Sequence, residues 1–173
     1  MKFKVAPSVL FLMPVVLLTL FSLSSATPAS ARSSITFTGV FLGHFTCTFS
    51  SSSFCTVSLK GYLRHFGEFA GSGAGPTGAG TCVRSFTGVV TFVTPNGDSL
   101  TTSSTGTETC SSDPSIYAET ATFTITGGTG RFAGATGSGT WTGINFVTSN
   151  TCSSGSCTAF GTTIELWKGS ISL

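Results

Sequence analysis

Charged residues are scarce in this chain, and the few that occur nearly cancel. Only 8% of the residues are Asp, Glu, Lys or Arg, and the formal net charge is +2. Two basic residues, Lys2 and Lys4, lie in a leader described below, so six basic residues remain against six acidic ones. Because this leaves no basic surface, we expect no binding to nucleic acid.

The chain also lacks the usual spacing of metal and cofactor motifs. It has only two His residues, His44 and His65, and no Cys-x-x-Cys pair, so no metal site is predicted. Two glycine patterns beginning at Gly73 and Gly128 match the dinucleotide fingerprint, but no helical pattern follows either of them. Since that fingerprint requires a helix N-terminus to hold the pyrophosphate, no cofactor is predicted.

Strong helix formers are sparse after residue 31, where Thr, Ser and Gly dominate and no apolar pattern of helical period occurs. Alternation of period two is typical of half-buried strands. We predict an all-β fold in which eight strands form a closed antiparallel barrel. The predicted strands are residues 34–41, 43–49, 54–64, 82–93, 99–110, 116–126, 137–147 and 159–167.

One long hydrophobic run is present, at residues 9–23, between Lys4 and the small residues Ala29, Ser30 and Ala31. This arrangement is typical of a secretory signal peptide. We predict cleavage after Ala31, a single domain over residues 32–173, and secretion to the extracellular or periplasmic space. The alternative is a leader retained as a membrane anchor; no other segment is long and apolar enough to cross a membrane as a helix.

All six Cys residues follow the leader, and in a short exported chain they predict three disulfides. Cys82 and Cys110 lie opposite each other if residues 94–98 form a three-residue hairpin loop with Gly97 in the left-handed conformation. The other two pairs bracket short polar tips symmetrically. They are Cys47 with Cys55 and Cys152 with Cys157.

The most specific stretch is residues 122–143, in which two strands flank a glycine-rich corner. Tyr117, Glu119, Ala121, Phe123 and Ile125 make one face of the first strand, and Thr residues dominate the other face. Gly127, Gly128 and Gly130 are expected to supply positive φ, after which Phe132 returns to the core.

This corner, Gly-Gly-Thr-Gly-Arg-Phe-Ala-Gly-Ala-Thr-Gly at residues 127–137, resembles the signature shared by allene oxide cyclases, dirigent proteins and a bacterial group of allene oxide cyclase barrel-like secreted proteins. Residues 41–49 and 94–100 resemble other segments of the bacterial group. The resemblance implies an eight-stranded antiparallel barrel and, from the plant relatives, an apolar cavity that holds a reactive small molecule. It also implies a dimer or trimer, and no reaction follows from it.

Four polar residues on inward faces form the candidate site. The predicted register places Arg84 opposite Glu108, and Tyr117 and Glu119 lie on the next strand, so all four converge at one mouth of the barrel. They could orient a ligand or act in acid-base chemistry. The alternative is a half-exposed Arg84–Glu108 pair with Glu119 in solvent.

Three functions follow from these observations. Binding of a small apolar molecule inside the barrel is favoured. An isomerase or cyclase acting on a reactive apolar substrate, through Glu119, Arg84 and Glu108, is the second. A structural or surface-interaction protein with a packed barrel is the third, for which an exposed apolar patch would be the sign. Residues 71–80 are expected to form a loop or lid over one end.

Overall fold

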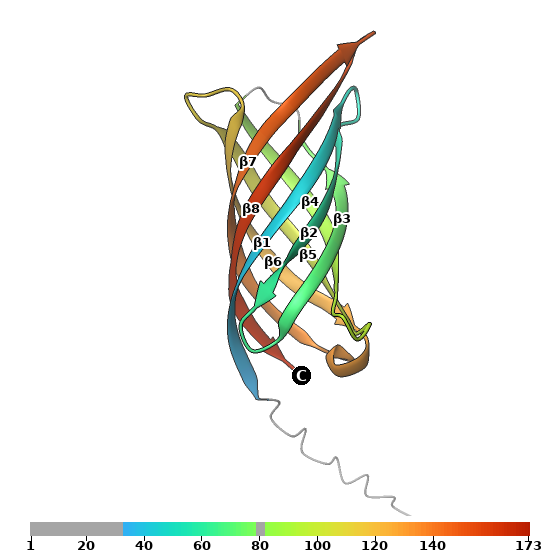
Figure 1. The fold of residues 1–173 in the computed structure, drawn as a ribbon, viewed down its shortest axis with the longest axis vertical. Coiled ribbons are helices and arrows are strands. Elements are labelled where there is room, and N and C mark those ends of the chain that lie inside the picture. The colour runs from blue at the N-terminus through green and yellow to red at the C-terminus, as the bar shows by residue number, and fades with distance from the viewer. Residues whose placement is uncertain (1–32, 79–81) are drawn as a thin grey trace, which may run out of the picture. The chain divides into compact units, whose positions relative to one another are not determined.

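The structure, a computed structural model, describes residues 33–78 and 82–173. Eight antiparallel strands close into a barrel in sequence order, from β1 beside β2 to β8 beside β1 (Figure 1). The prediction of an all-β closed barrel is confirmed. The elements are β1 (Ser34–Phe49), β2 (Phe54–Leu63), β3 (Gly67–Pro76), β4 (Val83–Val93), β5 (Ser99–Cys110), β6 (Ile116–Gly128), the 3-10 helix η1 (Gly130–Phe132), β7 (Thr136–Ser153) and β8 (Ser156–Ser172).

The predicted leader and its cleavage site lie outside the described residues. Within residues 33–78 and 82–173, no helix has the length and hydropathy needed to cross a membrane.

Two of the predicted strand assignments are wrong. Residues 34–41 and 43–49 form the single strand β1, which continues through residue 42 into Gly43 without a turn. The predicted lid at residues 71–80 belongs up to Pro76 to β3, which pairs with β2 along its length. The error has a physical cause. The inward positions of β3 beyond Phe69 are all glycines, so the segment lacks the alternation of apolar residues from which a strand is predicted.

The hairpin predicted for residues 94–98 is present and sets the register of β4 and β5. The Thr94 N–H donates to the Asp98 carbonyl at 2.9 Å, and Gly97 has a φ of 88°. This register pairs Arg84 with Glu108 and continues to the Cys82–Cys110 disulfide. The other two predicted disulfides, Cys47–Cys55 and Cys152–Cys157, are also formed.

All three disulfides lie toward one end of the barrel, which we call the upper end. It carries the β1–β2, β5–β6 and β7–β8 turns and is uppermost in Figure 1. Cross-links of this kind typically stabilise a fold by about 2–4 kcal/mol. They reinforce the part of the barrel that, as shown below, is not filled by apolar side chains.

Aromatic side chains fill the lower half of the barrel. Phe41, Phe92 and Trp167 contact one another, with ring centroids 4.9–5.9 Å apart. Glycines on facing strands make room for these rings: a Cβ at Gly71 would lie 2.8 Å from the Phe92 ring. The lower half is therefore a packed core rather than a channel.

The glycine-rich corner closes the lower end. Phe132 of η1 is fully buried and contacts the rings of Phe66 and Phe69, as the sequence predicted. The positive φ angles are at Gly130, Gly134 and Gly137. The prediction of positive φ at Gly127 and Gly128 is wrong, because β6 continues through both residues before the chain turns.

One part of the outer surface is apolar. Val40 of β1 pairs with Tyr62 and Leu166, and Ile164 of β8 pairs with Leu42 and Ile144. The six side chains are 42–57% exposed, so they form a continuous patch over β2, β1, β8 and β7. Such a patch fits self-association, and the homo-oligomer stays a prediction.

Candidate functional site

Four charged side chains enter the barrel along one cross-strand row. Arg84 pairs with Glu108, and Glu108 pairs with Glu119. The row continues through Gly143 of β7 to Glu165 of β8. Because neighbouring strands are about 4.8 Å apart, the backbones of Glu119 and Glu165 are separated by roughly 10 Å. The intervening glycine has no side chain to fill the space between the two carboxyl groups.

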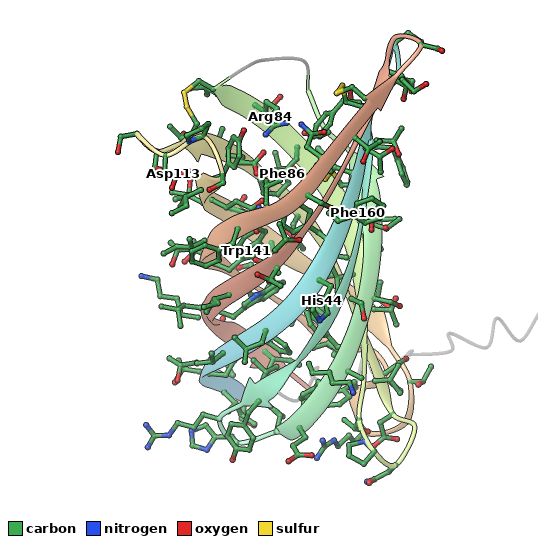
Figure 2. The ribbon with its side chains drawn as sticks, turned by 45° about the horizontal axis from the view of Figure 1, so that its top comes forward. His44, Arg84, Phe86, Asp113, Trp141 and Phe160 are labelled. Carbon is green, nitrogen blue, oxygen red and sulfur yellow. A yellow bond between two sulfur atoms is a disulfide. The ribbon has the colours of Figure 1, made fainter. Side chains whose placement is uncertain are left out.

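Arg84 is held from three sides near the upper end (Figure 2). Its Nη2 lies 3.0 Å from Glu108 Oε2, and its guanidinium carbon lies 4.8 Å from the Phe49 ring centroid and 4.9 Å from that of Tyr117. The Arg84 and Glu108 side chains are only 10% and 14% exposed. The alternative of a half-exposed surface pair is therefore wrong.

Glu119 lies one layer deeper than Arg84, and it does not lie in solvent as the alternative required. The Asn145 amide Nδ2 donates to Glu119 Oε1 and also to Glu108 Oε1, the second bond measuring 3.1 Å. Burial away from water raises the pKa of Glu119 to about 8, and the charges of Glu108 and Glu165 add to this. The carboxyl group of Glu119 is therefore mostly protonated at neutral pH.

Glu165 is a site residue that sequence reasoning missed. It is 5% exposed, its Oε2 accepts a 2.7 Å hydrogen bond from Trp167 Nε1, and burial raises its pKa to about 7. The signal was hidden because Ile164 and Leu166 on either side are apolar and face outward. The apolar residues that mark the inward face of β8 are Ala159, Trp167 and Ile171, of which Trp167 is the nearest to Glu165.

The upper half of the barrel contains a cavity of about 120 Å³. Apolar rings and chains form part of its wall, and polar groups from β5, β6, β7 and β8 form the rest. The residues important here are Phe86, Val90, Trp141, Trp167, Ser104, Glu108, Glu119, Asn145, Thr163 and Glu165. Figure 2 shows Arg84, Phe86 and Trp141 following one another from the upper end into the barrel.

A second, more open pocket of about 470 Å³ lies at the upper mouth. Arg84 and Tyr117 line it, together with Pro114 of the β5–β6 turn and Asn150 of β7. Glu108 lines both this pocket and the cavity. The predicted cluster is therefore brought together in two layers, with Arg84, Glu108 and Tyr117 at the mouth and Glu119 below them.

Several polar atoms around the cavity have no hydrogen-bond partner within the described residues. They are Ser104 Oγ, Thr163 Oγ1 and Trp141 Nε1, on residues that are 4%, 3% and 7% exposed. Arg84 Nε, at the mouth, is also unpartnered. An unsatisfied buried polar group typically costs about 1–3 kcal/mol. The three residues that carry Ser104 Oγ, Thr163 Oγ1 and Trp141 Nε1 line one small cavity, and their unused hydrogen-bonding capacity indicates a place that can hydrogen-bond something other than the protein itself.

The arrangement can donate and accept protons and hydrogen bonds, but it offers no metal centre. Among the residues that the structure describes, no group of three His, Cys, Asp or Glu side chains could hold a metal ion. Comparisons with protein-family models, with curated proteins and with solved structures find no match to this chain.

Proposed function

We propose that this barrel is a binding protein for a small molecule held in the upper cavity. The observation that carries the proposal is that Ser104, Thr163 and Trp141, which line one cavity, each carry a buried polar atom without a hydrogen-bond partner. A barrel whose only requirement was stability would fill this space with apolar side chains, as it does in the lower half. The upper half instead keeps both the space and the polar groups.

The size of the cavity limits the ligand. An apolar cavity of about 150 Å³ accommodates benzene, so 120 Å³ fits a molecule of about six non-hydrogen atoms, or one end of a longer molecule that extends into the mouth. The residues that line the cavity determine which chemical class of ligand fits it. Phe86, Val90 and the two Trp rings suit an apolar body, and the polar groups of β5 to β8 suit one polar end.

We predict that Gly88→Leu abolishes binding without unfolding the barrel. Gly88 lines the cavity, and a Cβ there would meet only the Ala74 backbone, at 3.6 Å from its carbonyl oxygen. A leucine side chain would therefore occupy the cavity, and replacing a strand glycine should leave stability equal or raised by up to about 1 kcal/mol. Fluorescence titration with cyclopentanol, cyclopentanone and cyclopentylamine checks this, because both Trp residues of the chain line the cavity.

The control is Gly127→Leu at the lower end of β6, where a Cβ would meet nothing within 4 Å. It should bind the same probes as the wild type. The proposal is refuted if no probe changes the fluorescence of the wild type, or if Gly88→Leu folds and binds them unchanged.

We further propose that the protein acts outside the cytoplasm after losing residues 1–31. Three disulfides are compatible with an oxidising compartment, and the residue pattern of the leader supports export. The resemblance of residues 127–137 to allene oxide cyclase barrel-like proteins supports kinship with that secreted group. Edman sequencing of the exported protein, with Arg32 as the expected first residue, tests the cleavage site.

The second candidate is an isomerase or cyclase that uses acid-base chemistry. It is favoured by two carboxyl groups, Glu119 and Glu165, whose pKa values are raised to about 8 and about 7 beside one cavity. Glu119→Gln, which keeps the shape of the side chain, should then lower turnover of reactive apolar epoxides at least about a hundredfold. Glu68→Gln, on the exposed face of β3, should not change turnover; equal turnover by both variants would remove Glu119 from the mechanism.

A further inference from the structure

The acidic groups of the cavity outnumber the cations available to them. The titratable and charged groups facing inward near it are Arg84 from β4, Glu108 from β5, Tyr117 and Glu119 from β6, and Glu165 from β8. Arg84 is already paired with Glu108 at 3.0 Å. Neither Glu119 nor Glu165 forms an ion pair of its own with a cation among the described residues, and the charge of Arg84 opposes only a small part of the rise that burial causes in the pKa of Glu119.

The unused acceptor atoms point to the same missing partner. Glu119 and Glu165 each accept a hydrogen bond at one carboxyl oxygen, from Asn145 and from Trp167, and no donor of the described residues reaches the other oxygen. The hydroxyl groups of Ser104 and Thr163 are unpartnered and can also accept. Four oxygen acceptors from β5, β6 and β8 thus surround one space.

The aromatic walls add a second source of attraction for a cation. The rings of Trp141 and Trp167 are stacked, with centroids 5.8 Å apart and planes 13° apart, and Phe86 lies 5.6 Å from Trp141. Indole faces attract cations, by about 2 kcal/mol or more where water is excluded. A neutral ligand would gain from the walls by burial alone, and would bring no positive charge to the two carboxyl groups.

We propose that the ligand of the cavity is a small organic ammonium ion, with its N–H groups on Glu119, Glu165 and the Ser104 and Thr163 hydroxyls and its carbon body against the Trp rings. This inference rests on the proposed binding function. No three-carboxylate metal site exists among the described residues, so an organic cation is the ligand class that matches both the acceptors and the aromatic walls. The site releases one proton from Glu119 when the ammonium ion enters, because the raised pKa means that the empty site holds that proton at neutral pH.

The test compares two ligands of nearly the same shape, cyclopentylamine and cyclopentanol, by Trp fluorescence at pH 6, 7 and 8. The amine stays cationic over this range, since ordinary alkyl amines titrate near pH 10. Its Kd should fall by about tenfold for each pH unit as Glu119 loses its proton. The Kd of the alcohol should stay constant or rise, and at pH 8 the amine should bind at least about tenfold more tightly.

Glu119→Gln supplies the second measurement. It should weaken amine binding at pH 8 by about tenfold or more and remove most of the pH dependence, and it should change alcohol binding much less than amine binding. Glu68→Gln should behave as the wild type. An alcohol that binds as tightly as the amine, or an amine that binds more weakly as the pH rises, overturns the ammonium assignment and leaves the proposed function standing. Failure of both probes to bind the wild type overturns both.

Discussion

The free energy of unfolding is expected to fall as the pH rises from 5 to 9, and Glu119→Gln is expected to remove the larger part of that fall. The pKa of Glu119 is about 8 in the folded protein against 4.5 for an ordinary Glu. The folded state therefore holds a proton that the unfolded chain releases. The stability linked to this proton is complete below about pH 4.5 and is lost as the pH rises through about 8.

The expected size of the effect follows from the shift. Each pKa unit corresponds to about 1.4 kcal/mol, so Glu119 accounts for a loss on the order of 5 kcal/mol between pH 4.5 and pH 9. Glu165, raised to about 7, adds a smaller loss of the same sign that is complete at lower pH. Urea unfolding at pH 5, 7 and 9, with the disulfides intact, measures both.

The control for this prediction is Glu68→Gln, whose exposed side chain should leave the pH dependence of the wild type unchanged. At pH 9 the Glu119→Gln variant should be more stable than the wild type, because it carries no charge into the cavity. A wild-type unfolding free energy that stays constant from pH 5 to 9 would show that water reaches both carboxyl groups freely.

Replacing Arg84, the cation at the upper mouth of the barrel, should cause the second large change, a loss in the free energy of unfolding. Arg84→Met leaves the largely buried Glu108 carboxylate without its 3.0 Å partner and removes the ring contacts with Phe49 and Tyr117. Breaking a buried pair from one side typically costs about 3–5 kcal/mol. We expect a loss of that size at pH 7. The double variant Arg84→Met with Glu108→Gln should recover most of it, because no unpaired charge remains.

Arg131 provides the matched surface comparison. It lies 3.6 Å from Asp98 with its side chain 43% exposed, and its Nη2 donates to the Phe66 carbonyl oxygen at 2.6 Å, so Arg131→Met should cost about 2 kcal/mol or less, below the loss expected for Arg84→Met. A double-mutant cycle on Arg84 and Glu108 measures the coupling directly. A loss below about 1 kcal/mol for Arg84→Met would show that the pair is as solvated as an ordinary surface pair.

The candidate site was predictable from sequence wherever a turn set the register. The residues of the β4–β5 turn place Arg84 opposite Glu108, and the alternation of β6 places Glu119 on the inward face. Glu165 could not be found in this way, because its apolar neighbours Ile164 and Leu166 face outward and reverse the usual polarity of the strand. Its position follows from pairing across β7 and β8, which joins residues distant in the chain.

The strand β3 is a second feature that local sequence patterns could not predict, and it concerns the fold rather than the site. Its inward positions beyond Phe69 are glycines, which carry no local pattern and read as a loop. They are required by side chains from other strands: the Phe92 ring occupies the space that a Cβ at Gly71 would take. When a glycine is required by an aromatic ring from a distant strand, the residues next to that glycine give no indication of the requirement.

The sequence by itself determined the all-β class, the three disulfide pairs and the buried corner at Phe132, because each depends on alternation, turn residues or spacing within one hairpin. Only the tertiary structure decided that the lower half is filled while the upper half keeps a cavity of about 120 Å³. It also decided that Glu119 and Glu165 line the same cavity. Both outcomes depend on closure of the barrel, which brings inward side chains of β4 to β8 around one space and removes their carboxyl groups from water.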